Sequence, residues 1–171
     1  TTGTVYFSFI LNITSLGSLN ATGGYWTGLI ESGSTSVFGA TIWTRLNGTG
    51  FDIGINPRTT AANTVWSTGP YSTSTSYFIV GSYQLVSGTG NDVVKLWVNP
   101  ALGGSEPAAT ITATNTGGTD LASLARLFLR QDGASATPGN IDYDELRIGT
   151  TWAQVAPGGS TPTITLSSPT Q

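Results

Sequence analysis

Apolar residues in this chain alternate with other residues at every second position over most of its length. Val5, Phe7, Phe9 and Leu11 are each two positions apart, and later segments repeat that spacing. Side chains two apart lie on the same side of an extended strand, whereas an amphipathic helix needs apolar residues three and four apart. Runs of good helix formers are nearly absent. The chain is therefore restricted to β-sheet whose strands bury one face.

About ten short strands follow from this pattern. The clearest cover residues 5–11, 25–31, 38–46, 51–55, 77–86, 93–98, 109–113, 124–131 and 141–148. Glycine-rich turns such as Asn47-Gly48-Thr49-Gly50 separate them. We expect an all-β fold, a two-sheet antiparallel β-sandwich of the jelly-roll kind. A helix or helical turn is expected only at residues 120–124, where Asp120 can act as a cap.

The domain organisation follows from length and from the last segment. The 171 residues suit one domain that can bury a core without disulfides or metals. Residues 157–162, Pro-Gly-Gly-Ser-Thr-Pro, have the composition of a linker, and residues 163–166 alternate like a strand. We predict a domain at 1–156 and a linker with a tail strand at 157–171. That strand either begins a following module or adds to the sheet edge of a neighbour.

The amino-acid composition limits the classes of partner and the cellular location that we expect. Only 9% of the residues are charged, and Gly, Ser, Thr and Asn supply the polar surface, which favours a secreted or cell-surface protein. The six Lys and Arg residues are scattered and the net charge is -3, which disfavours nucleic acid and anionic membranes as partners. No segment predicts membrane insertion. The absence of Cys and His removes thiolate chemistry, the commonest general base and the commonest transition-metal ligand.

Four segments carry a family resemblance. They are residues 5–9 (VYFSF), 94–100 (VKLWVNP), 129–130 (LR) and 141–152 (IDYDELRIGTTW). Together they resemble bacterial LamG-like modules of the concanavalin A-like lectin and glucanase superfamily, over residues 4–155. The closing segment is the most specific of the four. The resemblance implies a jelly roll with one concave and one convex sheet, and superfamily members bind sugars, hydrolyse β-glucans or space other domains.

The sequence argues against an enzyme. Glucanases of this superfamily carry two catalytic glutamates on one strand in a Glu-x-Asp-x-x-Glu pattern, because retaining hydrolysis needs carboxyl groups about 5–5.5 Å apart. The only glutamates here are Glu31, Glu106 and Glu145, and none lies in that pattern. Nucleophilic triads fail as well without His or Cys. We expect no catalytic activity.

Two carboxylates of the closing segment are candidate metal ligands. An aspartate of the closing strand helps to hold a structural calcium in the sugar-hydrolysing relatives, so the resemblance implies Asp144 as the first ligand and Asp142 as the second. Calcium takes about six to eight oxygens, so backbone carbonyls near Gly3 and the first strand would have to complete the shell. The alternative is that Asp144 caps a turn or pairs with Arg147 or another arginine.

Aromatic rings that the core does not need predict a sugar-binding face, because rings and planar polar groups suit pyranose sugars. The alternation points Phe7, Phe9, Phe38 and Phe51 into the core. If the other strands join one sheet, six side chains line its concave face. These are Trp43, Arg45, Asp52, Asn56, Trp97 and Arg130. The alternative is that Trp43 and Trp97 simply pack, and a β-bulge would reverse the assignment of faces.

Loop aromatics form a second candidate site. Tyr25 and Trp26 follow Gly23-Gly24, and Trp66 and Tyr71 flank a loop. Rings in such loops bind ligands or close the end of a sandwich. Trp152, after the last strand, is expected to fold back over the edge of the core.

Two functions stay open at this point. The first is a non-catalytic carbohydrate-binding or surface-adhesive module of an exported bacterial multidomain protein, with a polysaccharide or glycan as partner. The second is a structural spacer or extracellular filament subunit that uses its tail strand for assembly. The partners would then be adjacent modules of the same polypeptide or further copies of the chain.

Overall fold

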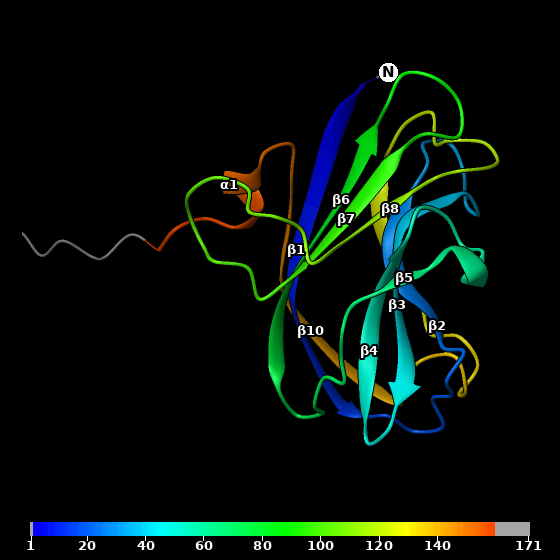
Figure 1. Ribbon diagram of the computed structural model, residues 1–171, viewed down its shortest axis with the longest axis vertical. Coiled ribbons are helices and arrows are strands. Elements are labelled where there is room, and N and C mark those ends of the chain that lie inside the picture. The colour runs from blue at the N-terminus through cyan, green and yellow to red at the C-terminus, as the bar shows by residue number, and fades with distance from the viewer. Residues whose placement is uncertain (1, 160–171) are drawn as a thin grey trace, which may run out of the picture.

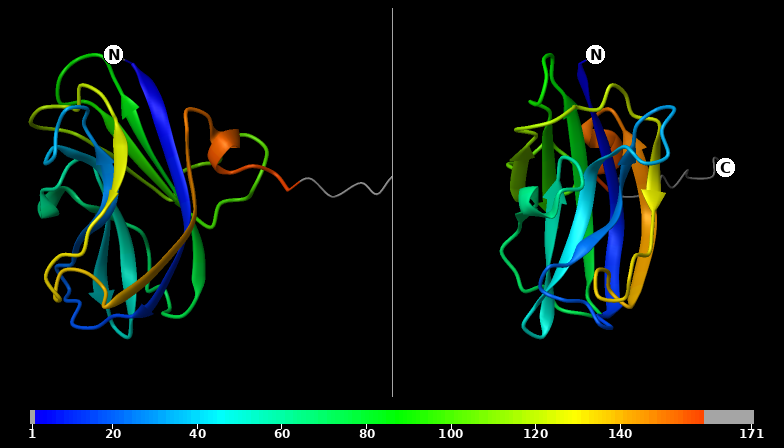
Figure 2. Two further views of the ribbon diagram at one scale, coloured as in Figure 1. Left: turned by 180° about the vertical axis from the view of Figure 1, so that it is seen from behind. Right: turned by 90° about the vertical axis from the view of Figure 1, so that its right-hand side faces the viewer.

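The computed structural model describes residues 2–159 and consists almost entirely of strands (Figure 1). Two five-stranded antiparallel sheets pack face to face, which confirms the predicted two-sheet sandwich (Figure 2). The predicted tail strand at residues 163–166 lies outside the described residues. No helix within 2–159 is long and apolar enough to cross a membrane.

The two sheets are named after their central strands. The β1 sheet has the order β10-β1-β6-β7-β8 and the β3 sheet the order β5-β4-β3-β2-β9. The strands of the β1 sheet are β1 (Gly3–Ser15), β6 (Ser76–Leu85), β7 (Val93–Val98), β8 (Ile111–Thr114) and β10 (Asn140–Gly149). Those of the β3 sheet are β2 (Gly24–Ile30), β3 (Phe38–Asn47), β4 (Gly50–Asn56), β5 (Val65–Trp66) and β9 (Arg126–Leu129). The chain passes between the sheets after β1, β5, β8 and β9.

The core between the sheets is built from the predicted alternation. Phe7, Phe9, Leu11 and Ile13 of β1 are all 0% exposed. Across the interior they meet side chains of β3 and β4 in one apolar cluster, which includes Ile42. Burying an aliphatic or aromatic side chain of this size is worth roughly 1.5–3 kcal/mol. The period-two pattern therefore accounts for the main core.

A second apolar cluster covers the outer face of the β1 sheet. The helix α1 (Trp152–Val155) follows β10 and packs Trp152 and Val155 on Val80 and Trp97. The Ser8 hydroxyl donates a buried 2.7 Å hydrogen bond to the Val155 carbonyl and so fastens the helix to β1. The expectation that Trp152 folds over the core edge is wrong, because its helix lies on the opposite side of the sheet from the main core.

One predicted core residue lies on the other side of its sheet. The pairing of β2 with β3 contains register shifts, and Ala40 has a φ of 45°. Phe38 consequently contacts Tyr25 and Phe128 on the outer face of the β3 sheet, with ring centroids 5.8 and 4.6 Å away. A bulge shifts the alternation by one residue and turns side chains to the other face. The predicted inward orientation of Phe38 is therefore wrong.

The helical turn expected at residues 120–124 does not form. That segment has no helix, and the Asp120 carboxylate instead accepts hydrogen bonds from the Asn91 and Asp92 backbone and from Asn115 Nδ2. Burial acts to raise the pKa of Asp120, but these hydrogen bonds outweigh it and lower that pKa. Asp120 therefore ties together two loops instead of capping a helix. A short 3₁₀ helix lies elsewhere, at η1 (Ala61–Asn63).

Candidate functional site

The outer face of the β3 sheet carries a group of neighbouring aromatic rings. Tyr25 of β2 lies 5.3 Å from Trp43 of β3 between ring centroids, and Phe38 and Phe128 join them as described above. Tyr25, Phe38 and Phe128 are partly exposed. The tilted and edge-on arrangements are those that aromatic pairs prefer. We call this surface, together with Trp66 and the polar groups described next, the aromatic face.

One arginine stacks on the central tyrosine of the aromatic face. Arg130 follows β9, and its guanidinium carbon lies 4.2 Å from the centroid of the Tyr25 ring. Its Nη2 atom donates to Asp132 at 2.5 Å. The side chain of Arg130 is 30% exposed, so a ligand can reach its remaining N–H groups. A cation above an aromatic ring is attracted by the electron density of the ring face.

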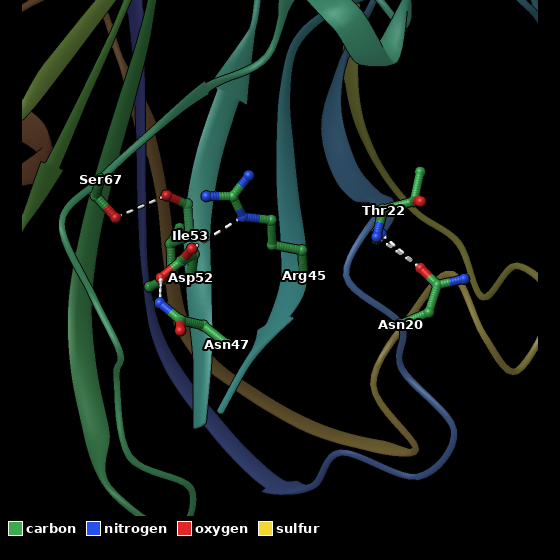
Figure 3. A network of polar contacts seen from close by, with 8 residues as sticks. Asn20, Thr22, Arg45, Asn47, Asp52, Ile53 and Ser67 are labelled. Atoms are coloured by element: carbon green, nitrogen blue, oxygen red, sulfur yellow. Dashed lines mark hydrogen bonds and ion pairs between the residues drawn. The ribbon is translucent and has the colours of Figure 1, made fainter. Parts of the chain in front are cut away.

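A second arginine, Arg45, stacks on Trp66. The buried carboxylate of Asp52 orients it (Figure 3). The guanidinium carbon of Arg45 lies 4.3 Å from the Trp66 ring centroid, and its Nε donates to Asp52 Oδ2 at 2.9 Å. Asn47 Nδ2 donates to the other oxygen of Asp52 at 2.8 Å. Arg45 binds Asp52 through Nε and not through its two terminal nitrogens. The side chain of Asp52 is 3% exposed and that of Arg45 36%, so Asp52 positions a donor that solvent reaches.

Two further predicted site residues lie on this face but hold the structure together. Trp43 is 4% exposed, and its Nε1 donates to Thr41 Oγ1 at 2.9 Å. Asn56 is 0% exposed, and its Nδ2 donates to the Thr60 carbonyl and to Thr64 Oγ1. Asn56 thereby fixes the loop between β4 and β5. Neither side chain offers a free polar atom to a ligand.

Trp97 does not join the other five predicted residues. It belongs to β7 in the β1 sheet, is 1% exposed and donates from Nε1 to the Pro107 carbonyl at 3.0 Å. Its ring centroid lies 5.0 Å from that of Trp152. The predicted placement of Trp97 on one face with Trp43 is wrong, because the alternation of a strand does not say which sheet the strand enters.

The two candidate calcium ligands lie on the edge strand β10. Asp142 is paired with Asn12 and Asp144 with Ile10 of β1, and both carboxylates are exposed. Asp144 Oδ1 accepts from the Glu145 backbone N–H at 2.7 Å. Arg147, the other predicted partner of Asp144, pairs with Glu145 instead.

These two residues do not fit a calcium shell by themselves. No cluster of three or more Asp, Glu, His or Cys residues exists in the part of the chain that the structure describes. Gly3, which pairs with Leu85, lies at the start of β1, whereas Asp142 pairs with Asn12 near its end. The backbone carbonyls near Gly3 are therefore not beside Asp142. Two carboxylates fall short of the oxygens that calcium takes. Calcium binding stays a prediction without support from this geometry.

The sequence pattern predicts some residues of the aromatic face and not others. Trp66 was expected beside a loop, whereas it lies in β5, which has only two residues, too few to show alternation. Tyr25 lies in β2, the strand expected at residues 25–31. Phe128 lies between Arg126 and Arg130 at alternate positions, and that spacing was the one signal for the ring on this face. The stacking of arginines on rings from other strands depends on strand order and has no local signal.

Comparisons of the chain with protein-family models, with curated proteins and with solved structures find no match in any of the three. What can be said about function therefore depends on the fold and on the geometry of the aromatic face.

Proposed function

We propose that this chain is a non-catalytic carbohydrate-binding or surface-adhesive module of an exported bacterial multidomain protein, of the LamG-like, concanavalin A-like jelly-roll type. The observation that carries the proposal is the pair of stacks on one open sheet face, Arg130 on Tyr25 and Arg45 on Trp66. Aromatic rings bind the apolar C–H faces of sugars, and oriented guanidinium groups donate to sugar hydroxyls. Preformed surfaces of this kind bind with a smaller ordering cost than flexible ones.

The positions of the glutamates support a non-catalytic role. Glu31 accepts a hydrogen bond from the Ala122 backbone at the end of β2, and Glu106 accepts from Tyr6 and Lys95 on the outer face of the β1 sheet. Glu145 pairs with Arg147 on β10. The three therefore lie in separate parts of the sandwich, whereas glycoside hydrolysis needs two carboxyl groups across one bond.

Two arginine variants test the proposal. Arg130→Ala removes the stack on Tyr25, and Arg126→Ala is its matched control, since Arg126 lies on β9 and donates to the Ser34 carbonyl, outside the stack. We expect Arg130→Ala to weaken binding to a responsive polysaccharide about tenfold and Arg126→Ala to leave it unchanged. Binding is measured by affinity electrophoresis with cellulose derivatives, xylan, laminarin, mannan and pectin.

Two results would contradict the proposal. One is the absence of binding to every glycan in that panel. The other is binding that the two arginine variants reduce equally, since that would locate the glycan away from Tyr25.

The second candidate function, a spacer or filament subunit, is favoured by the edge strand β10. It is ten residues long, and its Leu146 and Ile148 are 47% and 52% exposed. Open edges add strands from other chains, and charges on an edge oppose this. The acidic residues of β10 oppose pairing with a second β10, whereas residues 163–166, Thr-Ile-Thr-Leu, carry no charge.

Light scattering of residues 1–171 and of residues 1–159 separates this candidate from the first. Assembly that disappears on removal of the tail, and also in Ile148→Lys, supports a subunit that polymerises by strand addition. A monomer at all concentrations for both lengths contradicts it.

A further inference from the structure

A cavity of about 490 Å³ lies between the edge strands of the two sheets. β9 and β10 are edge strands of their sheets, and both lie on the same side of the sandwich in the right-hand view of Figure 2. Six of the lining residues determine which ligand the cavity suits. They are Trp26, Leu129, Thr137, Ile141, Asp142 and Tyr143. The volume is in the range of pockets that hold small organic ligands.

Three buried polar groups around this cavity have no hydrogen-bond partner. In the described part of the chain, seven buried side-chain atoms lack one, and three of these are Trp26 Nε1, Thr137 Oγ1 and Tyr143 Oη. Trp26 and Thr137 are each 2% exposed. Native proteins pair nearly all buried polar atoms with protein groups or ordered water, so three exceptions around one cavity call for polar partners from outside the chain.

The tyrosine of this group is neutral and able to donate. Burial raises the pKa of the Tyr143 hydroxyl, and the nearby Thr27 side chain opposes part of that rise. Thr27 donates its own hydroxyl hydrogen to the Phe128 carbonyl, and no contact of Tyr143 Oη has hydrogen-bond geometry. The ring of Tyr143 is fixed against Phe9, with centroids 4.4 Å apart. Its hydroxyl is therefore held near the Thr27 hydroxyl without reaching the geometry of a hydrogen bond.

The charges around the cavity select a neutral ligand. Asp142 contributes a carboxylate, which disfavours an anion. Arg130 also lines the cavity, but its guanidinium is paired with Asp132 and stacked on Tyr25. An indole N–H only donates, so Trp26 needs an acceptor oxygen and disfavours a metal ion. Leu129, 60% exposed, and Ile141 add apolar surface.

We propose that this cavity binds one neutral, hydroxyl-bearing sugar residue. A sugar oxygen accepts from Trp26 Nε1, sugar hydroxyls exchange hydrogen bonds with Tyr143 and Thr137, and ring C–H groups contact Leu129 and Ile141. The site goes beyond the proposed function, because it lies between the sheets while the aromatic face lies outside them. Trp26 and Tyr25 are neighbours in β2 and point to opposite sides.

The test uses the indole N–H signals of the full chain in ¹⁵N-labelled form. Trp26→Phe assigns one of the five indole signals to the cavity. Methyl glycosides of glucose, galactose, mannose and xylose serve as probes. We expect at least one of them to shift the Trp26 indole signal saturably, while Tyr143→Phe and Thr137→Val each weaken that binding about tenfold.

A blocking variant provides a second readout that does not depend on the polar groups. Leu129→Trp fills the mouth of the cavity, and Leu102→Trp is its matched control, since Leu102 is 59% exposed and does not line the cavity. We expect Leu129→Trp to abolish the shift of the Trp26 signal and Leu102→Trp to preserve it. Both variants change a solvent-exposed leucine, so both are expected to fold.

Three results would overturn this inference. The Trp26 signal does not move with any of the glycosides, or Leu129→Trp and Leu102→Trp bind equally, or cyclohexane shifts the signal as strongly as the sugars. Failure of the proposed function is seen separately, because a glycan on the aromatic face shifts the Trp66 indole and responds to Arg45→Ala, and neither of these residues lines the cavity.

Discussion

The outer faces of the two sheets carry similar groups of side chains but differ in what covers them. On the β1 sheet, Lys95 lies 5.9 Å above the Trp97 ring and pairs with Glu106 at 3.0 Å. On the β3 sheet, Arg45 lies 4.3 Å above Trp66 and pairs with Asp52 at 2.9 Å. Each face thus has a cation, a ring and a carboxylate in contact.

The difference between these faces comes from a segment distant in sequence. α1 covers Trp97 and reduces its exposure to 1%, while Trp66 stays partly exposed on its edge strand. The exposure of the carboxylates shows the opposite trend, because the side chain of Asp52 on the β3 sheet is 3% exposed and that of Glu106 on the β1 side is 27% exposed. Whether a ring on these strands is structural or available to a ligand therefore depends on the segment that covers it and not on the pattern of its own strand.

The largest expected effect concerns the two tryptophans. Trp97→Ala empties the centre of the cluster under α1 and should lower the free energy of unfolding by about 3–5 kcal/mol. Trp66→Ala, on a two-residue edge strand, should cost about 1–2 kcal/mol, because less of its surface is buried. Urea unfolding followed by circular dichroism measures both. Equal losses of unfolding free energy in Trp97→Ala and Trp66→Ala would contradict the distinction between a covered and an open face.

For the two carboxylates the larger loss of unfolding free energy is expected on the open β3 face, because Asp52 is more buried than Glu106. Asp52→Ala leaves Arg45 Nε and Asn47 Nδ2 without their buried acceptor, so we expect a loss of about 1–3 kcal/mol. Glu106→Ala breaks a more exposed pair with Lys95 and should cost at most about 1 kcal/mol. The same unfolding experiment compares them. A greater loss for Glu106→Ala would show that burial does not rank these two ion pairs.

The smallest effect concerns pH and the phenol of the covered face. Tyr6 lies between Trp97 and Trp152, and burial, with a further contribution from the Glu106 hydrogen bond, raises its pKa from 10.0 to about 12. A raised folded-state pKa adds stability that is complete below pH 10 and is lost as pH rises towards 12. Tyr6→Phe should therefore flatten part of the decline in stability between pH 10 and 12.

Other groups titrate in the same range, so the pH experiment depends on a difference. Burial also raises the pKa of Tyr83 and Tyr143, and both remain in Tyr6→Phe. The quantity to measure is the unfolding free energy of the native chain minus that of the variant at each pH. A difference that stays constant from pH 8 to pH 12 contradicts a perturbed Tyr6.

The sequence predicted the strands and the main core because both depend on local spacing. The alternation from Val5 to Leu11 was sufficient to place Phe7 and Phe9 inside. It failed at Phe38, where a bulge shifts the face by one residue. It also failed at Trp97, whose strand β7 joins the β1 sheet because the neighbouring strand β6 pairs with β1, far away in the chain. The aromatic face was predicted in part, since Arg45 and Asp52 come from one hairpin while their neighbour Trp66 comes from a separate strand.

The position of α1 determines the direction in which the chain leaves the described domain. The backbone N–H of Gly103 binds the Ala156 carbonyl at 3.0 Å, so the segment after α1 stays beside the loop that follows β7. That exit lies on the side of the β1 sheet (Figure 1). Arg45 and Arg130 lie on the outer face of the other sheet, so both stacks are directed away from the side on which α1 and the Gly103 loop meet.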